Sequence, residues 1–265
     1  MSQKPPQKTP PGERIAKVIA RAGLASRREA ERLIEAGRVR VNGMRVERAA
    51  LNVGPKDRIE VDGKLLGAPE PPRLWLYHKP TGLVSTARDE QGRETMFDAL
   101  PDDLPRVMSV GRLDLNSEGL LLLTNDGEIK RRLELPSTGW LRKYRVRVNG
   151  RPSDETLAPL REGLTLDGES FQPMQVTLDR QKGANAWMTV GLREGKNREI
   201  RRAMAAIGLT VNRLIRISFG PFQLGTLKSG EGMEVRNRVL REQLGLPSDK
   251  DDTPAPHRTI RRRKR

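Results

Sequence analysis

Cysteine is absent from this chain of 265 residues, and histidine occurs only twice, as His78 and His257. Without thiols, the sequence excludes disulfides, cysteine-ligated zinc, iron–sulfur clusters and a cysteine nucleophile. One histidine outside the polar C-terminal segment is too little for a histidine metal site or a Ser-His-Asp triad. Any catalysis must use carboxylates, tyrosine, lysine or arginine, and we expect neither a metal nor another cofactor.

Long apolar runs are also missing. The longest run of leucines has four residues, whereas a membrane-spanning helix needs roughly 20 mostly apolar residues. No apolar segment follows the charged start of the chain, so we identify no secretory signal. These absences predict a cytoplasmic protein that does not enter a membrane.

Acidic residues are outnumbered by basic ones, 34 Asp and Glu against 50 Lys and Arg, which gives a formal net charge of +16. Such an excess indicates a polyanionic partner, with nucleic acid as the first choice. The length allows one sizeable domain and a small additional module.

Changes in composition divide the chain into parts. Residues 1–12 and 246–265 lack apolar periodicity and are predicted to be disordered, and the second of these tails is basic. The Pro-rich stretch 67–72 is predicted to be a linker. It separates a small module, residues 13–66, from a larger domain, residues 73–245.

The small module is predicted to contain two helices and a hairpin. The first helix starts near Arg14 and ends at Gly23, and Ser26 with Glu29 has the spacing of a capping box for the second helix. Asn42-Gly43 then predicts a tight turn between two strands.

This string, LASRREAERLIEAGRVRVNG, resembles the S4 RNA-binding domain, in which a helix pair and a hairpin form a basic surface that faces RNA. The candidate RNA-binding residues share a place on the second helix or the hairpin: Arg27, Arg28, Arg32, Arg38 and Arg40. Each alone could be an ordinary solvated charge. Their clustering beside a helix N-terminus favours phosphate contact.

The larger domain mixes helices and strands, so the sequence predicts an α+β fold. Strands are expected at residues 74–77, 143–148, 171–178, 187–192 and 214–219. Three helices are expected to be capped by Asn125-Asp126, by Ser153 or Asp154, and by Asn197, and the first is expected to include Leu135.

One segment of this domain, GRLDLNSEGLLLLTNDG at residues 111–127, places a carboxylate, Asp114, on a polar loop before a continuous apolar run. Such a run is typical of a strand buried on both faces. Catalytic groups often lie on loops that a rigid core holds. An isolated Gly-Arg-Leu-Asp, by contrast, more often belongs to an ordinary solvated turn.

Together with YHKPTGLVST, KYRVRV and KNREIRRAM, this segment resembles the RsuA family of RNA pseudouridine synthases, closest to its RluB-like members. The resemblance covers most of the chain and implies a mixed, mainly antiparallel sheet flanked by helices. It also implies that Asp114 is the catalytic residue, that Tyr144 stacks on the target base, and that Arg201 approaches the Asp114 carboxylate. Arg198 and Arg202 are interpreted as solvent-facing, and Glu118 as structural.

The implied reaction is the isomerisation of a uridine to pseudouridine in ribosomal RNA, with large-subunit RNA as the first choice. Asp114 would attack either C1′ of the ribose or C6 of the base, and the sequence does not choose between them. We expect a monomer whose partner is ribosomal RNA. The alternatives are the same chemistry on small-subunit ribosomal RNA or transfer RNA, and a non-catalytic RNA-binding ribosome-assembly factor.

Overall fold

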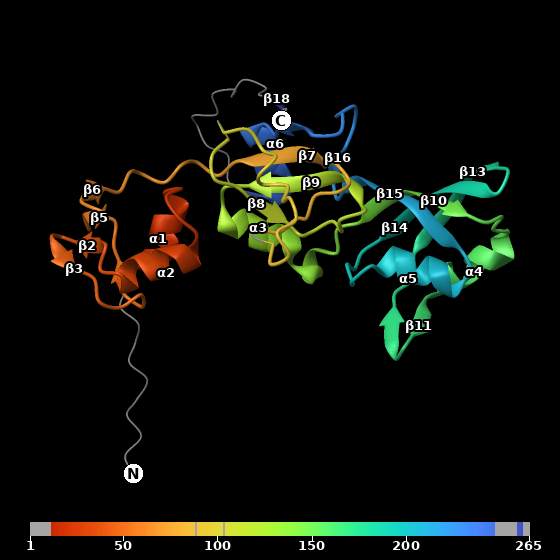
Figure 1. Cartoon of the computed structure of the whole chain (residues 1–265), viewed down its shortest axis with the longest axis horizontal. Coiled ribbons are helices and arrows are strands. Elements are labelled where there is room, and N and C mark those ends of the chain that lie inside the picture. The colour runs from red at the N-terminus through yellow and green to blue at the C-terminus, as the bar shows by residue number, and fades with distance from the viewer. Residues whose placement is uncertain (1–11, 88, 103, 247–258, 262–265) are drawn as a thin grey trace, which may run out of the picture. The chain divides into compact units, whose positions relative to one another are not determined.

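The structure is a computed structural model that describes residues 12–87, 89–102, 104–246 and 259–261 (Figure 1). Contacts divide the chain into two units. One ends at Pro72 and includes Asn125–Gly127, and the other consists of Arg73–Thr124 and the residues from Glu128 onward. Both units combine helices with strands, which confirms the predicted α+β class. Within the described ranges, no helix is long and apolar enough to cross a membrane.

The first unit is a helix pair followed by short antiparallel strands with a core of their own. Its elements are β1 (Glu13–Arg14), α1 (Ile15–Arg21), α2 (Arg27–Glu35), β2 (Val39–Val41), β3 (Met44–Arg45), β4 (Asn52–Val53), β5 (Ile59–Val61) and β6 (Lys64–Leu65). The predicted capping box starts α2, because the Glu29 N–H donates to Ser26 Oγ and the Ser26 N–H donates to the Glu29 carboxylate. The predicted turn joins β2 to β3, with Asn42 and Gly43 both at positive φ.

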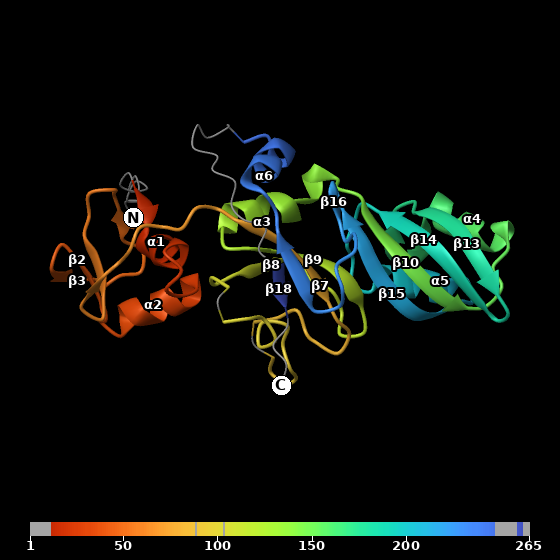
Figure 2. The same ribbon diagram turned by 90° about the horizontal axis from the view of Figure 1, so that it is seen from above.

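The second unit is built on one large sheet. Its elements are β7 (Leu74–Lys79), β8 (Met108–Val110), β9 (Glu118–Thr124), α3 (Gly127–Glu134), the 3-10 helix η1 (Pro136–Thr138), β10 (Arg142–Asn149), α4 (Asp154–Glu162), β11 (Leu164–Leu166), β12 (Glu169–Phe171), β13 (Gln175–Lys182), β14 (Asn185–Leu192), α5 (Glu199–Ala206), β15 (Thr210–Phe219), β16 (Phe222–Gln223), β17 (Glu231–Glu234), α6 (Asn237–Leu244) and β18 (Thr259–Arg261). Ten strands form the sheet in the order β13-β14-β10-β15-β9-β7-β17-β18, with β16 beside β15 and β8 beside β9 (Figure 2). The sheet is mixed and mainly antiparallel, as predicted.

The leucine run of β9 is buried on both faces of the sheet, as its sequence predicts. Leu121 and Leu123 belong to a core that includes residues of α4 and α5. Leu120 and Leu122 belong to a second core, which includes residues of α3 and α6. All four side chains are fully buried, so the strand after the Asp114 loop is held rigidly from two sides.

Three local predictions in this unit were wrong. Asn197 does not cap α5, which begins at Glu199 after Arg198, a residue in the left-handed conformation without a side-chain cap bond. The strand predicted at 171–178 is two strands, β12 and β13, because Pro173 between them has no N–H for a ladder. Leu135 lies beyond the end of α3 and is exposed. The helix ends before it because a residue that precedes a proline is disfavoured in the helical conformation.

The predicted disordered tails lie mostly outside the described residues, which leave out 1–11, 247–258 and 262–265. Residues 259–261 are a correction, because they form β18 against β17 and bury Ile260. Composition conceals this strand. One buried apolar residue, Ile260, is enough where the open edge of β17 supplies the hydrogen bonds.

Gly119 lies where β13, β14, β10 and β15 join the strands from β9 to β18, at the pairing of β15 with β9. This residue lies opposite Arg216 in the parallel pairing of β9 with β15. Its φ is +105°, and a Cβ atom at this position would lie 2.3 Å from the carbonyl oxygen of Arg216. Both the backbone conformation and the available space therefore require glycine.

We predict that Gly119→Ala lowers the free energy of unfolding by about 2–4 kcal/mol, because the added methyl group forces the two strands apart. Chemical denaturation of the full chain measures this loss. Gly67→Ala is the matched control, since no atom lies within 4 Å of its Cβ position. Equal unfolding midpoints for the two variants would show that the β9–β15 pairing tolerates a side chain.

Candidate active site

A cavity of about 280 Å³ lies between the loop that carries Asp114, the strands β10 and β15, and the start of α5. Its lining includes a carboxylate, an aromatic ring and several charged groups, among them Asp114, Tyr144, Arg142, Arg198, Glu199 and Arg216. Asp114 and Tyr144, which are far apart in the sequence, therefore share one cavity. Arg201 does not line this cavity but lies beside the loop.

The buried side chain of Lys79, at the end of β7, anchors the Asp114 loop. The Lys79 side chain is fully buried, and its Nζ donates to the carbonyl oxygens of Pro80 (3.0 Å), Asp114 (3.2 Å) and Ser117 (3.1 Å). Burial lowers the pKa of Lys79 to about 8, although the carboxylates of Asp114 and Glu118 counteract this effect. The ammonium group thus joins two ends of the loop to the strand before it.

Further hydrogen bonds fix the same loop on its other sides. The Ser85 hydroxyl donates to the Leu113 carbonyl (2.8 Å), and the Gly82 N–H donates to the Leu115 carbonyl (2.8 Å). The Gly111 N–H donates to the Glu134 carboxylate (2.6 Å). The backbone around Asp114 is therefore preorganised, while its side chain remains about one-third exposed.

The basic partner of the Asp114 carboxylate is Arg198, at 3.7 Å between Nη1 and Oδ2. Arg201 was expected in this place. Its guanidinium instead donates to the main-chain carbonyls of Asn116 (2.9 Å) and Val211 (3.0 Å). Arg201 therefore holds the backbone of the Asp114 loop. Arg198, which was interpreted as solvent-facing, is exposed, and it also pairs with the Asp114 carboxylate.

The conformation of Arg198 explains this exchange. Four non-glycine residues in the described ranges have positive φ, and the other three are Asn or Asp, which tolerate it well. Arg198, with φ of 49°, bears the strain of a residue with a long side chain in the left-handed region. It directly precedes α5, and this geometry directs its side chain to the loop.

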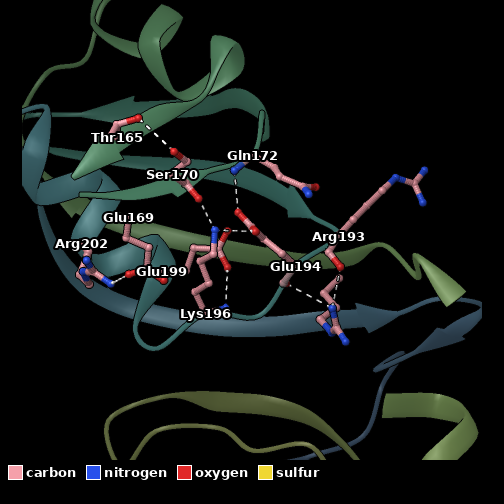
Figure 3. A network of polar contacts seen from close by, with 10 residues as sticks. Thr165, Glu169, Ser170, Gln172, Arg193, Glu194, Lys196, Glu199 and Arg202 are labelled. Carbon is pink, nitrogen blue, oxygen red and sulfur yellow. Dashed lines mark hydrogen bonds and ion pairs between the residues drawn. The ribbon is translucent and has the colours of Figure 1, made fainter. Parts of the chain in front are cut away.

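The segment that carries Arg198 is supported by a network of polar contacts with the β11–β12 hairpin (Figure 3). The Lys196 ammonium contacts the Ser170 carbonyl and the Glu194 carboxylate. Glu194 also accepts from the Gln172 N–H (2.6 Å), and the Lys196 N–H donates to Glu199 (2.9 Å). The hairpin therefore fixes the position from which Arg198 reaches Asp114.

Glu199 is a buried carboxyl group in the wall of the cavity. Burial, together with the neighbouring Glu194 carboxylate, raises the pKa of Glu199 to about 7. Near neutral pH this group therefore exists in both protonation states.

Tyr144 and Arg216 lie opposite each other in the ladder of β10 with β15 and face the cavity. Arg216 is buried, and its Nε donates to the Leu120 carbonyl (2.6 Å), but its Nη2 is buried without a hydrogen-bond partner among the described residues. Arg142 lies nearby, with its guanidinium 4.7 Å from the centre of the Phe219 ring. The cavity wall thus contains two guanidinium groups that sequence reasoning missed.

The signal for these arginines is present in the strand pattern. Arg142 and Tyr144 are two residues apart on β10, and Arg216 follows Leu214 by two residues on β15, so all occupy inward positions. A charged residue at an inward position of an alternating strand is unusual and points to a polar cavity. Lys79 gives a similar signal, at the end of an apolar strand.

The five arginines predicted to bind RNA lie in the first unit. Arg27, Arg28 and Arg32 are exposed on α2, and Arg40 is exposed on β2. Arg38 is also exposed, but both arms of its guanidinium bond to the Asp62 carboxylate (2.7 and 2.6 Å). The structure thus leaves four of the five cations open to solvent without a carboxylate partner in the described part of the chain.

Glu199 generates a prediction about pH. Its pKa is about 7 in the folded protein and near 4.5 in the unfolded chain. The raised pKa therefore adds to the free energy of unfolding in full below pH 4.5, and this contribution is lost as the pH rises through 7. Between pH 5 and 8 the native protein should lose on the order of 1–3 kcal/mol from this group. Glu199→Gln cannot ionise and should avoid this loss.

Denaturation midpoints of the variant and the native protein across this pH range provide the measurement. The stability difference in favour of Glu199→Gln should grow as the pH rises. Glu162→Gln, which removes an exposed carboxylate at the end of α4, is the control. Parallel pH curves for Glu199→Gln and the native protein would contradict the raised pKa.

Comparison with known proteins agrees with this geometry. Residues 73–206 match the sequence profile of the family described as RNA pseudouridylate synthase, and residues 13–59 match that of the S4 domain. The chain is 46% identical over 231 residues to an uncharacterised RNA pseudouridine synthase of Rickettsia prowazekii, covering 87% of this chain and 97% of that protein. It is 40% identical over 262 residues to the ribosomal large subunit pseudouridine synthase B of Escherichia coli O157:H7, covering 95% and 90%.

The fold leads to the same family. A crystal structure of a pseudouridylate synthase superimposes with a TM-score of 0.62 at 26% sequence identity, covering 88% of this chain and all of that one. The resemblance inferred from the sequence motifs is therefore confirmed. The chain belongs to the RNA pseudouridine synthase family and is an RNA pseudouridine synthase with an N-terminal S4 domain.

Proposed function

We propose that this enzyme isomerises a uridine of large-subunit ribosomal RNA, with Asp114 as the nucleophile. The observation that carries the proposal is the position of the Asp114 carboxylate, on a loop anchored by Lys79 and beside the cavity that Tyr144 lines. The choice of RNA is supported by the relatives named ribosomal large subunit pseudouridine synthase B, at 40–42% identity.

The reaction requires little beyond a positioned carboxylate. The bond between N1 and C1′ breaks, the uracil turns, and a bond between C5 and C1′ forms, while C5 loses a proton and N1 gains one. Asp114 attacks either C1′ of the ribose or C6 of the base. Because the loop backbone is already fixed, little ordering of the loop remains to be done at the moment of reaction.

The cavity suits a single base removed from the RNA stack. Extrusion of the base costs stacking energy, and the Tyr144 ring offers a flat surface that restores part of it. The free Nη2 of Arg216 is a donor for a carbonyl oxygen, and uracil has two such oxygens. Arg142 adds positive charge on the same wall, which favours a base that becomes electron-rich when its glycosidic bond breaks.

The two arginines beside Asp114 are assigned different roles. Arg198 pairs with the carboxylate and orients it. Arg201 fixes the loop through the Asn116 carbonyl and links it to β15 through Val211. The S4 domain supplies affinity through the exposed arginines of α2 and β2, which contact phosphates without reading sequence.

The proposed function is tested by pseudouridine mapping of ribosomal RNA from cells that lack the gene. One large-subunit position should lose its pseudouridine and regain it when the native gene is restored. Restoration with Asp114→Asn should leave the position unmodified, because loss of a nucleophile typically lowers turnover by roughly 10³-fold or more. The purified variant should bind RNA as tightly as the native enzyme.

Each part of the proposal has its own contrary result. A mark lost from small-subunit RNA would refute the choice of substrate. Pseudouridine formation by Asp114→Asn at a comparable rate would refute the nucleophile.

The roles of Arg198 and Arg201 are separable. Arg198→Ala should lower the single-turnover rate by roughly 10²-fold, because a misoriented nucleophile is costly, while the melting temperature stays unchanged since the side chain is half exposed. Arg201→Ala should lower the rate and also the melting temperature, because it breaks two bonds to the backbone. Arg198→Lys should recover part of the rate. A native single-turnover rate for Arg198→Ala would show that Arg198 does not orient the Asp114 carboxylate, and would favour Arg201 as its partner.

A further inference from the structure

The strands at the β13 end of the sheet are covered on one side only. Val146 and Val148 of β10 pack into the core that includes α4 and α5. Figure 1 shows these two helices below the strands, and Figure 2 looks onto the opposite side, which no described helix covers. The residues between Tyr144 and Val148 that point to this open side, Arg145 and Arg147, are exposed.

The open side is strongly basic. The strand pairings bring six cationic residues to it from β10, β13 and β15, and we call this set the outer basic face: Lys143, Arg145, Arg147, Arg180, Lys182 and Arg213. Two carboxylates accompany it. Asp179 accepts from the Thr189 hydroxyl, and Glu118 pairs with Arg213. The excess of positive charge is therefore four.

Most of these cations have no anionic partner. Within the described ranges, Lys143, Arg147 and Arg180 make no ion pair. Arg147 also lies directly opposite Arg213 in the ladder of β10 with β15, and like charges in directly opposed positions destabilise a sheet. The face thus carries an electrostatic cost that no contact within the described chain offsets in full.

Trp187 lies in the middle of this face. It is directly opposite Arg147 on one side and Arg180 on the other, and the Arg145 guanidinium lies 5.0 Å from its ring centre. Trp187 is one of three tryptophans in the chain, and it is only half-buried. Cations arranged around an aromatic ring provide both phosphate contacts and a surface for base stacking.

We propose that the outer basic face is a separate RNA-binding surface, which holds RNA phosphates away from the catalytic cavity. The cavity lies on the other side of the same strands, because Tyr144 and Arg216 point into it while Arg145, the next residue on β10, points to the open side. One RNA that engages both sides must be large and folded, not a single short hairpin. The inference rests on the proposed function in one respect, which is that the large folded RNA is identified as ribosomal RNA.

RNA fits this face better than the other polyanions. Same-side residues on a strand are about 6.6 Å apart, and neighbouring strands about 4.8 Å, so the cations form a lattice that several phosphates of a folded RNA can occupy at once. An anionic membrane would favour apolar residues between the cations. Here Thr177 and Thr189 occupy such positions, and Trp187 is the aromatic residue among them.

The experiment compares the full chain with Arg145→Gln/Arg147→Gln and with Arg131→Gln/Arg132→Gln. The control pair lies exposed on α3 and removes the same charge. Binding to a full-length, unmodified large-subunit ribosomal RNA transcript is measured over a range of salt concentrations. Vesicles of phosphatidylglycerol serve as a second probe. Arg28→Gln/Arg32→Gln, on α2, reports the contribution of the S4 domain in the same assay.

The face variant should bind the transcript roughly 10-fold more weakly near physiological salt, with the slope of log affinity against log salt reduced by about 1–2. The α3 control should keep the native slope. At saturating enzyme, the single-turnover rate constant of the face variant should stay within about two-fold of the native value, because no group near Asp114 has changed.

Three results would overturn the proposal: a native salt slope for the face variant, an equal loss in the α3 control, or a loss of vesicle binding while RNA binding is unchanged. Failure of the proposed function gives a different result. The transcript would then receive no pseudouridine from any form of the enzyme, while the salt slopes of the face variant and the native chain would still differ.

Discussion

The active site depends on one buried ammonium group. Lys79 is at the end of β7, and its three hydrogen bonds to carbonyl oxygens join that strand to both ends of the turn that presents Asp114. A charge in this position is costly to desolvate, and three carbonyl dipoles with two nearby carboxylates compensate for it. The loop that carries Asp114 therefore has its position fixed before RNA binds. A neutral side chain of the same length would leave those carbonyls without a donor.

The remaining charges of the site contact the Asp114 carboxylate, the loop backbone or the segment that carries Arg198. Arg198 contacts the Asp114 carboxylate directly, Arg201 holds the loop backbone, and Glu194 with Lys196 supports the segment that carries Arg198. The strained backbone of Arg198 is tolerated because this network and the start of α5 determine its position from both sides. The Arg198–Asp114 pair is thus more exposed than the Glu194–Lys196 pair that supports it.

Much of the fold was predictable because it follows from local rules. The capping box at Ser26, the turn at Asn42-Gly43 and the doubly buried leucine run of β9 each depend on a few neighbouring residues. Family resemblance then placed Asp114 and Tyr144 correctly in one cavity. The exchange of Arg198 for Arg201 was not predictable, because it depends on a left-handed residue that no propensity favours for arginine. β18 was missed for a related reason, since only the edge of β17 makes a strand of Thr259–Arg261.

The two sides of β10 show how one strand can serve two purposes. Period-two alternation sends Tyr144 to the cavity and Arg145 to the opposite surface, so each side is set by every second residue. On the cavity side, burial makes each charge specific, because a guanidinium such as that of Arg216 must find a defined partner. On the outer side, charges stay solvated and bind phosphates without defined geometry. The chemical site and the surface for general RNA affinity are therefore separated by the thickness of a single sheet, so that residues can change on one side without replacing any residue on the other.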